Sequence, residues 1–352
     1  MRSLRVLVGY QVDEDYSLAQ HPIVREVGAR LDPDRFHLTA FYDHVPDRRL
    51  VARSNTTLVQ LPGHLRTAVR MRHLMGDVDR CWYLAPEPSS YLYLRLRPRR
   101  NVAVTSIEGH PWSDAFASVP DQVHRYAESL ITRSRRLTAV NQEVANELLA
   151  RFGRRAEVVP VGVDTDMFHP RVGPPPEQEN VLFVGALQPW KRPSLFLEAA
   201  ARFPEASFTL AGQGPQRAEL DRTVADRGLR NVRIVAPVSH AELAALYREA
   251  SVFLFPSRSE GSPKVLLEAA ASGLPSVTYG EYVPEAVEDG RTGFVTTSEA
   301  QMMDALGRLL CDPELRRAFG EKARQGAMSS GWDSVAARWS EVLAAPLPAG
   351  RL

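Results

Sequence analysis

Short apolar segments alternate with amphipathic segments along almost the whole chain. In the first half, runs rich in valine, leucine and isoleucine predict buried strands at 4–8, 36–41, 57–60, 80–84, 102–107 and 137–140. Helices are expected between them at 21–31, 64–75 and 141–152. Buried strands that alternate with helices are typical of a parallel sheet, because crossover helices cover both of its faces.

The alternation stops at 169–177, where four prolines exclude a helix or a central strand by removing N–H donors and fixing φ. It then resumes, with strands expected at 180–185, 207–211, 232–235, 252–255 and 274–278. The expected helices of this half lie at 193–203, 215–227, 241–250 and 263–272, followed by a nearly all-helical region at 299–347.

Two halves of this kind predict an α/β protein with two doubly wound, Rossmann-like domains. We place the first domain at 1–165, a linker at 166–179 and the second domain at 180–330. A C-terminal helix within 331–352 is expected to cross back to the first domain. The 352 residues suit two domains of about 150 residues each. Ligands of such sheets bind beyond the carboxyl ends of the strands, so we expect the domains to face each other across a ligand cleft.

Composition narrows the function further. The 43 basic and 42 acidic residues leave a net charge of +1, which argues against a nucleic-acid partner. Cys81 and Cys311 are too few for a disulfide framework or a metal site. No segment approaches the roughly 18 apolar residues of a membrane span, and we expect a cytoplasmic protein. The arginine-rich run at 95–100 is interpreted as a solvated face, with peripheral contact to a membrane or an anionic acceptor as the alternative.

The most specific chemical signal lies at 255–273. There a buried strand is followed by a loop with Glu260 and Gly261, and a helix is expected to begin with Ser262 as its N-cap and Pro263 at its first position. The start of a helix carries unpaired N–H groups and roughly half a positive charge, and it favours an anion such as phosphate. Gly261 would let a ligand approach the backbone closely.

Glu268 follows Pro263 by five residues, about 7.5 Å along a helix axis. One carboxylate can therefore meet a group attached to the phosphate while the other binds the hydroxyls of a sugar. The alternative is that Glu260 is a solvated loop residue and that Glu268 pairs with Lys264 four residues earlier.

This segment resembles the retaining glycosyltransferases of family 4, which have the GT-B fold. Glu260 and Glu268 match the family's E-x7-E signature, and AAASGLPSV follows as it does in the family. Further matches occur in the family's order: VPVGVDTDMFHP at 159–170, VGALQPWK at 184–191, LAGQGP at 210–215, the stretch 231–239, and EAVEDGRTGF at 285–294. The resemblance is strong from about 137 to 295 and weak over the first hundred residues.

The resemblance implies roles for individual residues. Glu268 would hold the ribose hydroxyls of a nucleotide sugar, and Glu260 would face the transferred sugar. The backbone after Gly261 would contact the diphosphate, and the base would lie near 236–238. The residues that the resemblance places around the donor are Gly9, Arg192, Gly212, Gly214, Pro237, Arg258, Gly261, Ser262, Lys264, Val265 and Glu268.

The family's catalytic Arg/Lys pair is only half present. Lys191 matches the lysine that stabilises the departing β-phosphate, but Ala186 stands at the arginine position, with Arg192 or Arg258 as possible substitutes. The chain has only three lysines, and Lys191 and Lys264 both fall in loops expected to face phosphate. A compact ammonium suits a phosphate clamp.

The first domain is expected to bind the acceptor, and here the sequence says less. The turn after the first strand has one glycine, Gly9, where the family usually has several. The family usually carries a histidine near the end of the strand at 102–107; here either Glu108 or His110 can face the cleft. Both are catalytic candidates, and their register stays open.

Two other chemistries fit poorly. The D-x-D spacing of a metal-dependent transferase occurs at Asp164 and Asp166 and at 77–79, but the first lies in an interdomain segment and the second precedes a strand. We therefore expect no metal. A dinucleotide fingerprint at 212–217 would require glycine where the chain has Arg217, which excludes nicotinamide binding.

We therefore expect a metal-independent, retaining glycosyltransferase with no cofactor. Its donor would be a nucleoside-diphosphate-sugar, with UDP as the expected nucleotide, and its acceptor a hydroxyl of a small molecule, a lipid or a glycan. Relatives of this kind are thought to use a front-face mechanism, in which the leaving diphosphate helps to deprotonate the acceptor. The alternatives are a nucleotide-sugar epimerase on the same architecture and a non-catalytic nucleotide-sugar-binding module.

Overall fold

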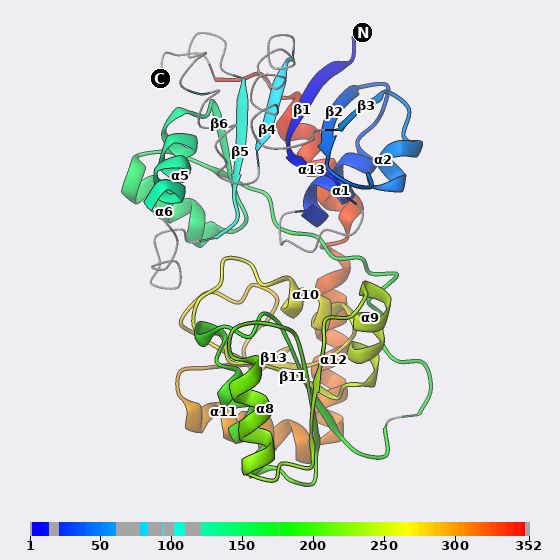
Figure 1. Cartoon of the computed structure of the whole chain (residues 1–352), viewed down its shortest axis with the longest axis vertical. Helices are drawn as coiled ribbons and strands as arrows, with labels where there is room; N and C mark the ends of the chain where they lie inside the picture. The colour runs from blue at the N-terminus through cyan, green and yellow to red at the C-terminus, as the bar shows by residue number, and fades with distance from the viewer. Residues whose placement is uncertain are drawn as a thin grey trace. The chain divides into compact units, whose positions relative to one another are not determined.

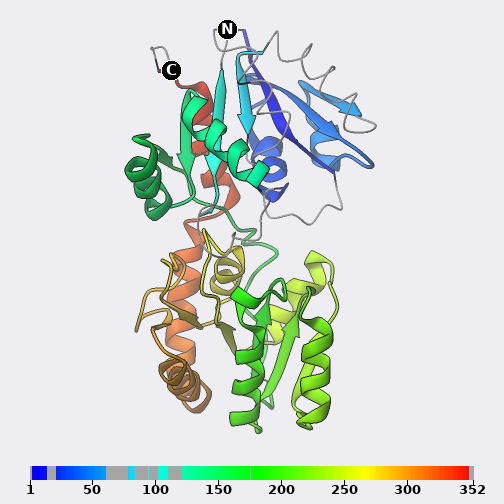
Figure 2. The ribbon, with the colours of Figure 1, turned by 60° about the vertical axis from the view of Figure 1, so that its left-hand side comes forward.

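A computed structural model of the chain describes residues 2–13, 21–60, 78–83, 94, 102–109, 121–174 and 176–348. The chain forms two compact units (Figure 1, Figure 2). The N-terminal unit comprises residues 1–161 and 332–352, and the C-terminal unit comprises residues 162–331. Each unit is built on a parallel sheet, which confirms the predicted α/β class and the Rossmann-like architecture.

The sheet of the N-terminal unit has the order β3-β2-β1-β4-β5-β6-β7, and every described pairing is parallel. Its strands are β1 Leu4–Gln11, β2 Phe36–Tyr42, β3 Thr56–Gln60, β4 Arg80–Tyr83, β5 Ala103–Ile107, β6 Arg136–Ala139 and β7 Glu157–Val158. Its helices are α1 His21–Arg30, α2 Arg48–Ala52, α5 Asp121–Arg133, α6 Gln142–Phe152 and α13 Trp332–Ala344. The helix expected at 64–75 lies outside the described residues.

The C-terminal helix α13 belongs to the core of the N-terminal unit. Trp339 packs against Trp82 of β4 with their ring centroids 4.7 Å apart, and both rings are buried. The Arg80 guanidinium donates to the carbonyl oxygens of Leu343 and Ala345 at 2.9 and 2.8 Å. A cation at the end of a helix compensates its last carbonyl groups, so Arg80 fixes the end of α13.

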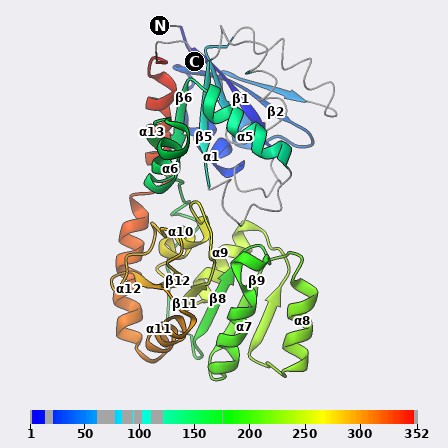
Figure 3. The same cartoon turned by 90° about the vertical axis from the view of Figure 1, so that its left-hand side faces the viewer.

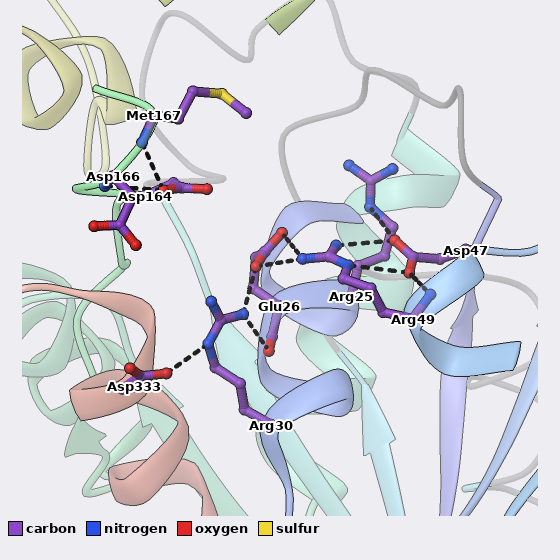
Figure 4. A network of polar contacts seen from close by, with 9 residues as sticks. All are labelled: Arg25, Glu26, Arg30, Asp47, Arg49, Asp164, Asp166, Met167 and Asp333. Atoms are coloured by element: carbon purple, nitrogen blue, oxygen red, sulfur yellow. Dashed lines mark hydrogen bonds and ion pairs between the residues drawn. The ribbon is translucent and has the colours of Figure 1, made fainter. Parts of the chain in front are cut away.

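Figure 4 shows how charged side chains join α1, α2 and α13 within this unit. The Glu26 carboxylate accepts from Arg30 at 2.5 Å and from Arg49 at 2.7 Å. Arg30 also donates to Asp333, the second residue of α13, at 2.8 Å. Ion pairs from two helices therefore converge on Glu26, whose side chain is mostly buried.

The sheet of the C-terminal unit has the order β10-β9-β8-β11-β12-β13 and is also parallel. Its strands are β8 Asn180–Val184, β9 Ser207–Ala211, β10 Val232–Val235, β11 Val252–Phe255, β12 Ser276–Tyr279 and β13 Gly293–Thr296. The helical elements are η4 Pro189–Lys191, α7 Pro193–Arg202, α8 Arg217–Asp226, α9 His240–Glu249, α10 Lys264–Ala271, α11 Glu299–Cys311 and α12 Pro313–Met328. In Figure 3, α12 lies beside α10, against which it packs.

The expected linker at 166–179 is part of the C-terminal unit, because side chains hold it there. Arg324 of α12 donates to the carbonyl oxygens of Phe168 and Thr165 at 2.8 and 3.1 Å. Its guanidinium also bonds the carbonyl of Ala271, the last residue of α10, at 2.7 Å. Arg171 donates to the Arg248 carbonyl at 2.8 Å. This segment is thus fastened to the unit that carries α10.

Candidate functional site

Two glycines bring the loops after β8 and β9 into direct backbone contact. A Cβ atom on Gly212 would lie 1.9 Å from the carbonyl oxygen of Gly185, and one on Gly214 would lie 2.6 Å from that of Leu187. The Leu187 N–H donates to the Gln213 carbonyl at 2.8 Å. Only glycine permits so close an approach, so Gly212 and Gly214 fix the path of the loop that leads to Lys191.

Lys191 ends the short helix η4 and lies over the end of β11. Its side chain passes Gly185, where a Cβ atom would be 3.3 Å from the lysine Cδ. The ammonium is 5.1 Å from the centroid of the Phe255 ring and forms an ion pair with Glu260. Because only 16% of the Lys191 side chain is exposed, it is not a freely solvated loop lysine.

Glu260 is held on its other side by Ser257. The buried Ser257 hydroxyl donates to Glu260 Oε1 at 2.7 Å, and 14% of the Glu260 side chain is exposed. The Arg258 N–H donates to the Trp190 carbonyl at 2.9 Å, which joins the Glu260 loop to η4. The interpretation of Glu260 as a solvated loop residue is therefore wrong.

Tyr282 adds a buried hydroxyl near this carboxylate. Its hydroxyl is 2.8 Å from that of Thr278. Burial raises the Tyr282 pKa well above its usual range, and the negative charge of Glu260 raises it further, against an opposing hydrogen bond with Thr278. The phenol thus stays protonated. The spacing of Tyr282 from Glu260 along the chain does not indicate that the charge of Glu260 acts on this hydroxyl.

Helix α10 begins at Lys264 with Pro263 as its N-cap, one residue later than predicted, because Pro263 has an extended ψ of 103°. Pro263 makes no side-chain capping hydrogen bond, whereas Ser239 and Ser298 cap the starts of α9 and α11. An uncapped helix start suits an anion. The four flanking candidates, Gly261, Ser262, Lys264 and Val265, are all partly exposed.

Glu268 lies one turn further along α10, and its hydrogen-bond partner is Tyr247 of α9. The Tyr247 hydroxyl donates to Glu268 Oε2 at 3.1 Å and also lies 3.1 Å from the Val265 carbonyl oxygen. Burial raises the pKa of Glu268, while the Tyr247 hydrogen bond and the charge of Lys264 act in the opposite direction. The apolar spacing of the expected helix at 241–250 predicts that Tyr247 is buried, but not that its hydroxyl meets a carboxylate.

The two arginines considered as substitutes at the clamp are turned toward carboxylates. Arg192 has a left-handed backbone with φ 52°, forms an ion pair with Glu299, and lies 5.1 Å from the centroid of the Tyr279 ring. Arg258 is 57% exposed and bonds Glu281 at 3.2 Å. These contacts direct both guanidinium groups toward other partners than the Lys191–Glu260 pair.

The remaining candidates are more widely spread. Pro237 lies exposed in the loop after β10. The carbonyl oxygen of Val235, the last residue of β10, accepts a hydrogen bond from the Gly212 N–H at 3.3 Å. In the N-terminal unit, Gly9 is buried within β1, because that strand continues to Gln11 instead of ending before a glycine turn. Glu108 directly follows β5 and is partly exposed, and His110 lies outside the described residues.

The first aspartate of the D-x-D motif at 164–166 forms hydrogen bonds with backbone N–H groups. Asp164 Oδ1 accepts from the N–H groups of Asp166 and Met167 at 3.1 and 2.9 Å (Figure 4). Within the described part of the chain, no three His, Cys, Asp or Glu side chains group as metal ligands would. In the same residues, no helix has the length and apolar character needed to span a membrane.

Comparison with known proteins agrees with this geometry. Residues 164–326 match the family model "Glycosyl transferases group 1". The D-inositol 3-phosphate glycosyltransferase of Streptomyces bingchenggensis is 32% identical over 246 residues, which are 62% of this chain and 54% of that protein. The chain spans about half the length of the curated relatives it matches.

Solved structures resemble the fold over nearly the whole chain. Sucrose-phosphate synthase of Thermosynechococcus elongatus gives a TM-score of 0.76 at 18% identity and covers 97% of this chain and 98% of its own. Anabaena HepE, solved with UDP and glucose, gives a TM-score of 0.78 at 15% identity. The match covers 98% of this chain and 100% of that protein. The solved structures show that the chain has the GT-B fold, and the family match over residues 164–326 confirms the resemblance found in the motifs.

Proposed function

We propose that this protein is a retaining glycosyltransferase that moves a sugar from a nucleoside-diphosphate-sugar to an acceptor hydroxyl. The observation that carries the proposal is the grouping of Lys191 and Glu260 beside the uncapped start of α10, with Glu268 one turn further along that helix. A cation and a helix start suit a diphosphate, and a carboxylate suits ribose hydroxyls. Structures of similar fold were solved with UDP, which supports UDP as the nucleotide.

In the proposed reaction, the bond between the anomeric carbon and the β-phosphate oxygen breaks, and the acceptor oxygen bonds that carbon on the same face. The acceptor proton passes to the departing diphosphate. Lys191 and the N–H groups at the start of α10 stabilise the negative charge that develops on the leaving group, so the mechanism requires no metal. Glu260 would orient Lys191 and contact the transferred sugar, and Glu268 would hold the ribose.

The acceptor is proposed to bind the N-terminal unit, with Glu108 or His110 as the candidate group that faces and orients it. Curated relatives are named D-inositol 3-phosphate glycosyltransferases, which makes a phosphorylated polyol one acceptor to test. Because this chain matches only about half of their length, lipid and glycan hydroxyls belong in the same test.

The decisive experiment is a panel of UDP, GDP, ADP and dTDP sugars, scored for nucleotide release with and without acceptors. Release that depends on an acceptor, and that survives EDTA, supports the proposal. NMR of the product should show the donor's anomeric configuration. Inverted configuration would contradict the retaining mechanism, and isomerised donor formed without acceptor would favour an epimerase.

One observation favours a second candidate, a non-catalytic nucleotide-sugar-binding module. The family arginine is replaced by the exposed Ala186, and Arg192 and Arg258 are both engaged by carboxylates. Such a module would bind UDP-sugars with ordinary affinity and release no nucleotide with any acceptor. Introducing the missing cation by Ala186→Arg would then separate a weakened enzyme, whose turnover should rise, from a module that stays inactive.

A further inference from the structure

The hydroxyl of Tyr247 touches the carboxylate of Glu268. It comes from α9, a different helix, and lies 3.1 Å from Glu268 Oε2. The Tyr247 side chain is 0% exposed, so water cannot take the place of this contact. The Glu268 residue as a whole is partly exposed.

Aromatic neighbours fix where this hydroxyl can be. Phe168 meets the Tyr247 ring edge-on, with ring centroids 5.6 Å apart and an interplanar angle of 85°. Phe253 of β11 contacts it at 5.6 Å and 40°. A ring held between two others on a packed core has little freedom, and its hydroxyl therefore stays at one point relative to α10.

We propose that Tyr247 is a positioning residue for nucleotide binding, which holds the plane of the Glu268 carboxylate so that its remaining lone pairs meet the ribose hydroxyls. A carboxylate has about four acceptor positions, and a hydrogen bond from Tyr247 occupies one of them without consuming the others. This inference rests on the proposed function, because it gives Tyr247 a role only if Glu268 binds a nucleotide.

The charges around the pair support this role. Burial raises the pKa of Tyr247 well above its usual range, and the negative charge of Glu268 raises it further, so the hydroxyl remains a donor at any working pH. The groups that face the Glu268 carboxylate are Tyr247 from α9 and Lys264 from its own helix, and both favour its ionised form. Removing the hydroxyl should therefore raise the pKa of Glu268 beyond the increase that burial already causes.

The test is Tyr247→Phe, which removes one oxygen and keeps the ring between Phe168 and Phe253. UDP binding by the full-length protein is measured by titration calorimetry from pH 5 to pH 9. We expect affinity to fall by about tenfold near neutral pH, since hydrogen bonds to charged groups are worth about this much. The loss should grow as pH falls, because more Glu268 becomes protonated, and it should shrink toward pH 9.

Two further variants keep the test independent of stability. Phe196→Leu loses packing in the same core, at a ring that contacts Phe183 and Phe208, and should lower thermal stability without moving the pH dependence of UDP binding. Glu268→Gln removes the titrating group and should flatten that pH dependence. Adding Tyr247→Phe to Glu268→Gln should then cost much less affinity than Tyr247→Phe alone.

The outcomes separate this inference from the function beneath it. If the unmodified protein binds UDP and Tyr247→Phe binds it equally well with the same pH profile, the positioning role is wrong and the proposed function stands. The positioning role would also be rejected if Tyr247→Phe lowered UDP affinity by the same factor with Glu268 present and in the Glu268→Gln variant. If the unmodified protein binds none of UDP, GDP, ADP or dTDP, the proposed function fails, and the role of Tyr247 fails with it.

Discussion

Each charged side chain of the candidate site is held by a neighbour of different chemistry. Lys191 lies over Phe255 and pairs with Glu260, Glu260 accepts from Ser257, and Glu268 accepts from Tyr247. Such support lowers the reorganisation needed when a ligand binds, which is how sites stabilise charge that develops during a reaction. The two carboxylates nevertheless differ, because Glu260 forms an ion pair with the Lys191 ammonium, whereas the hydrogen bond to Glu268 comes from the neutral phenol of Tyr247.

This difference predicts separate effects of two alanine variants. Lys191→Ala should lower kcat by about 10²–10³-fold with little change in UDP affinity, because its charge acts chiefly on the departing diphosphate. Glu268→Ala should instead weaken UDP binding. Steady-state kinetics and calorimetry measure both effects. Lys322→Ala, at an exposed lysine of α12, is the matched control and should change neither. Equal affinities and rates in Lys191→Ala and Glu268→Ala would contradict these assignments.

Elements were predictable where a local pattern determines them. Five of the six strands of the C-terminal unit are predicted within two residues of their observed bounds, because continuous buried runs such as 252–255 leave few alternatives. The start of α10 was placed one residue too early, since Ser262 is a common N-cap but Pro263 takes that place. β13 was not predicted, because its four residues follow a loop motif and have no long apolar run.

In the candidate site, too, the residues set by a local motif are predictable, and those brought in from other elements are not. The motifs indicate Lys191, Glu260 and Glu268 because each residue has a fixed place within a continuous motif, at 184–191 for the lysine and at 255–273 for the two glutamates. The motifs do not indicate Ser257 and Tyr247 as hydrogen-bond partners of the two carboxylates. The Tyr247 hydrogen bond joins residues 21 positions apart on different helices. Sequence periodicity records which face of a helix is buried, but not which hydroxyl on that face meets a carboxylate from another helix.

The loop that carries Lys191 should depend on the backbone contact at Gly212. In Gly212→Ala the new methyl group would lie 1.9 Å from the Gly185 carbonyl oxygen, where no flexible side chain can move aside. We expect the free energy of unfolding of the C-terminal unit to fall by about 1–3 kcal/mol, as in other overpacked sites.

Turnover should fall together with stability in Gly212→Ala, because the displaced loop carries Lys191 away from Glu260. Denaturant titration and steady-state kinetics test these two effects. Gly326→Ala is the control: it lies exposed in α12 with nothing near the added methyl, and it should stabilise the helix by about 0.5–1 kcal/mol. A stable Gly212→Ala variant with normal kcat would show that the contact does not position the loop.

In the molecule as a whole, chain order and packing do not coincide. The chain leaves the N-terminal unit after Val161 and returns to it at Trp332, so α13 completes a core whose other members lie far earlier in the sequence. The C-terminal unit has a separate apolar core. Two cores with different members can unfold in two steps, and variants or ligands that act on one unit should then move only one of them.

Trp339→Ala tests this independence. Its ring is buried against Trp82, and truncating a buried tryptophan costs about 3–5 kcal/mol. We expect calorimetry to show the transition of the N-terminal unit at a clearly lower temperature, with that of the C-terminal unit unchanged. UDP should act in the opposite way, since a ligand at 100 times its Kd adds about 2.7 kcal/mol to the unit that binds it. In the Trp339→Ala variant, UDP should therefore raise the upper transition and leave the lower one in place. If both transitions moved together with either change, the two units would unfold as one, and the ligand could not be assigned to the C-terminal core by this means.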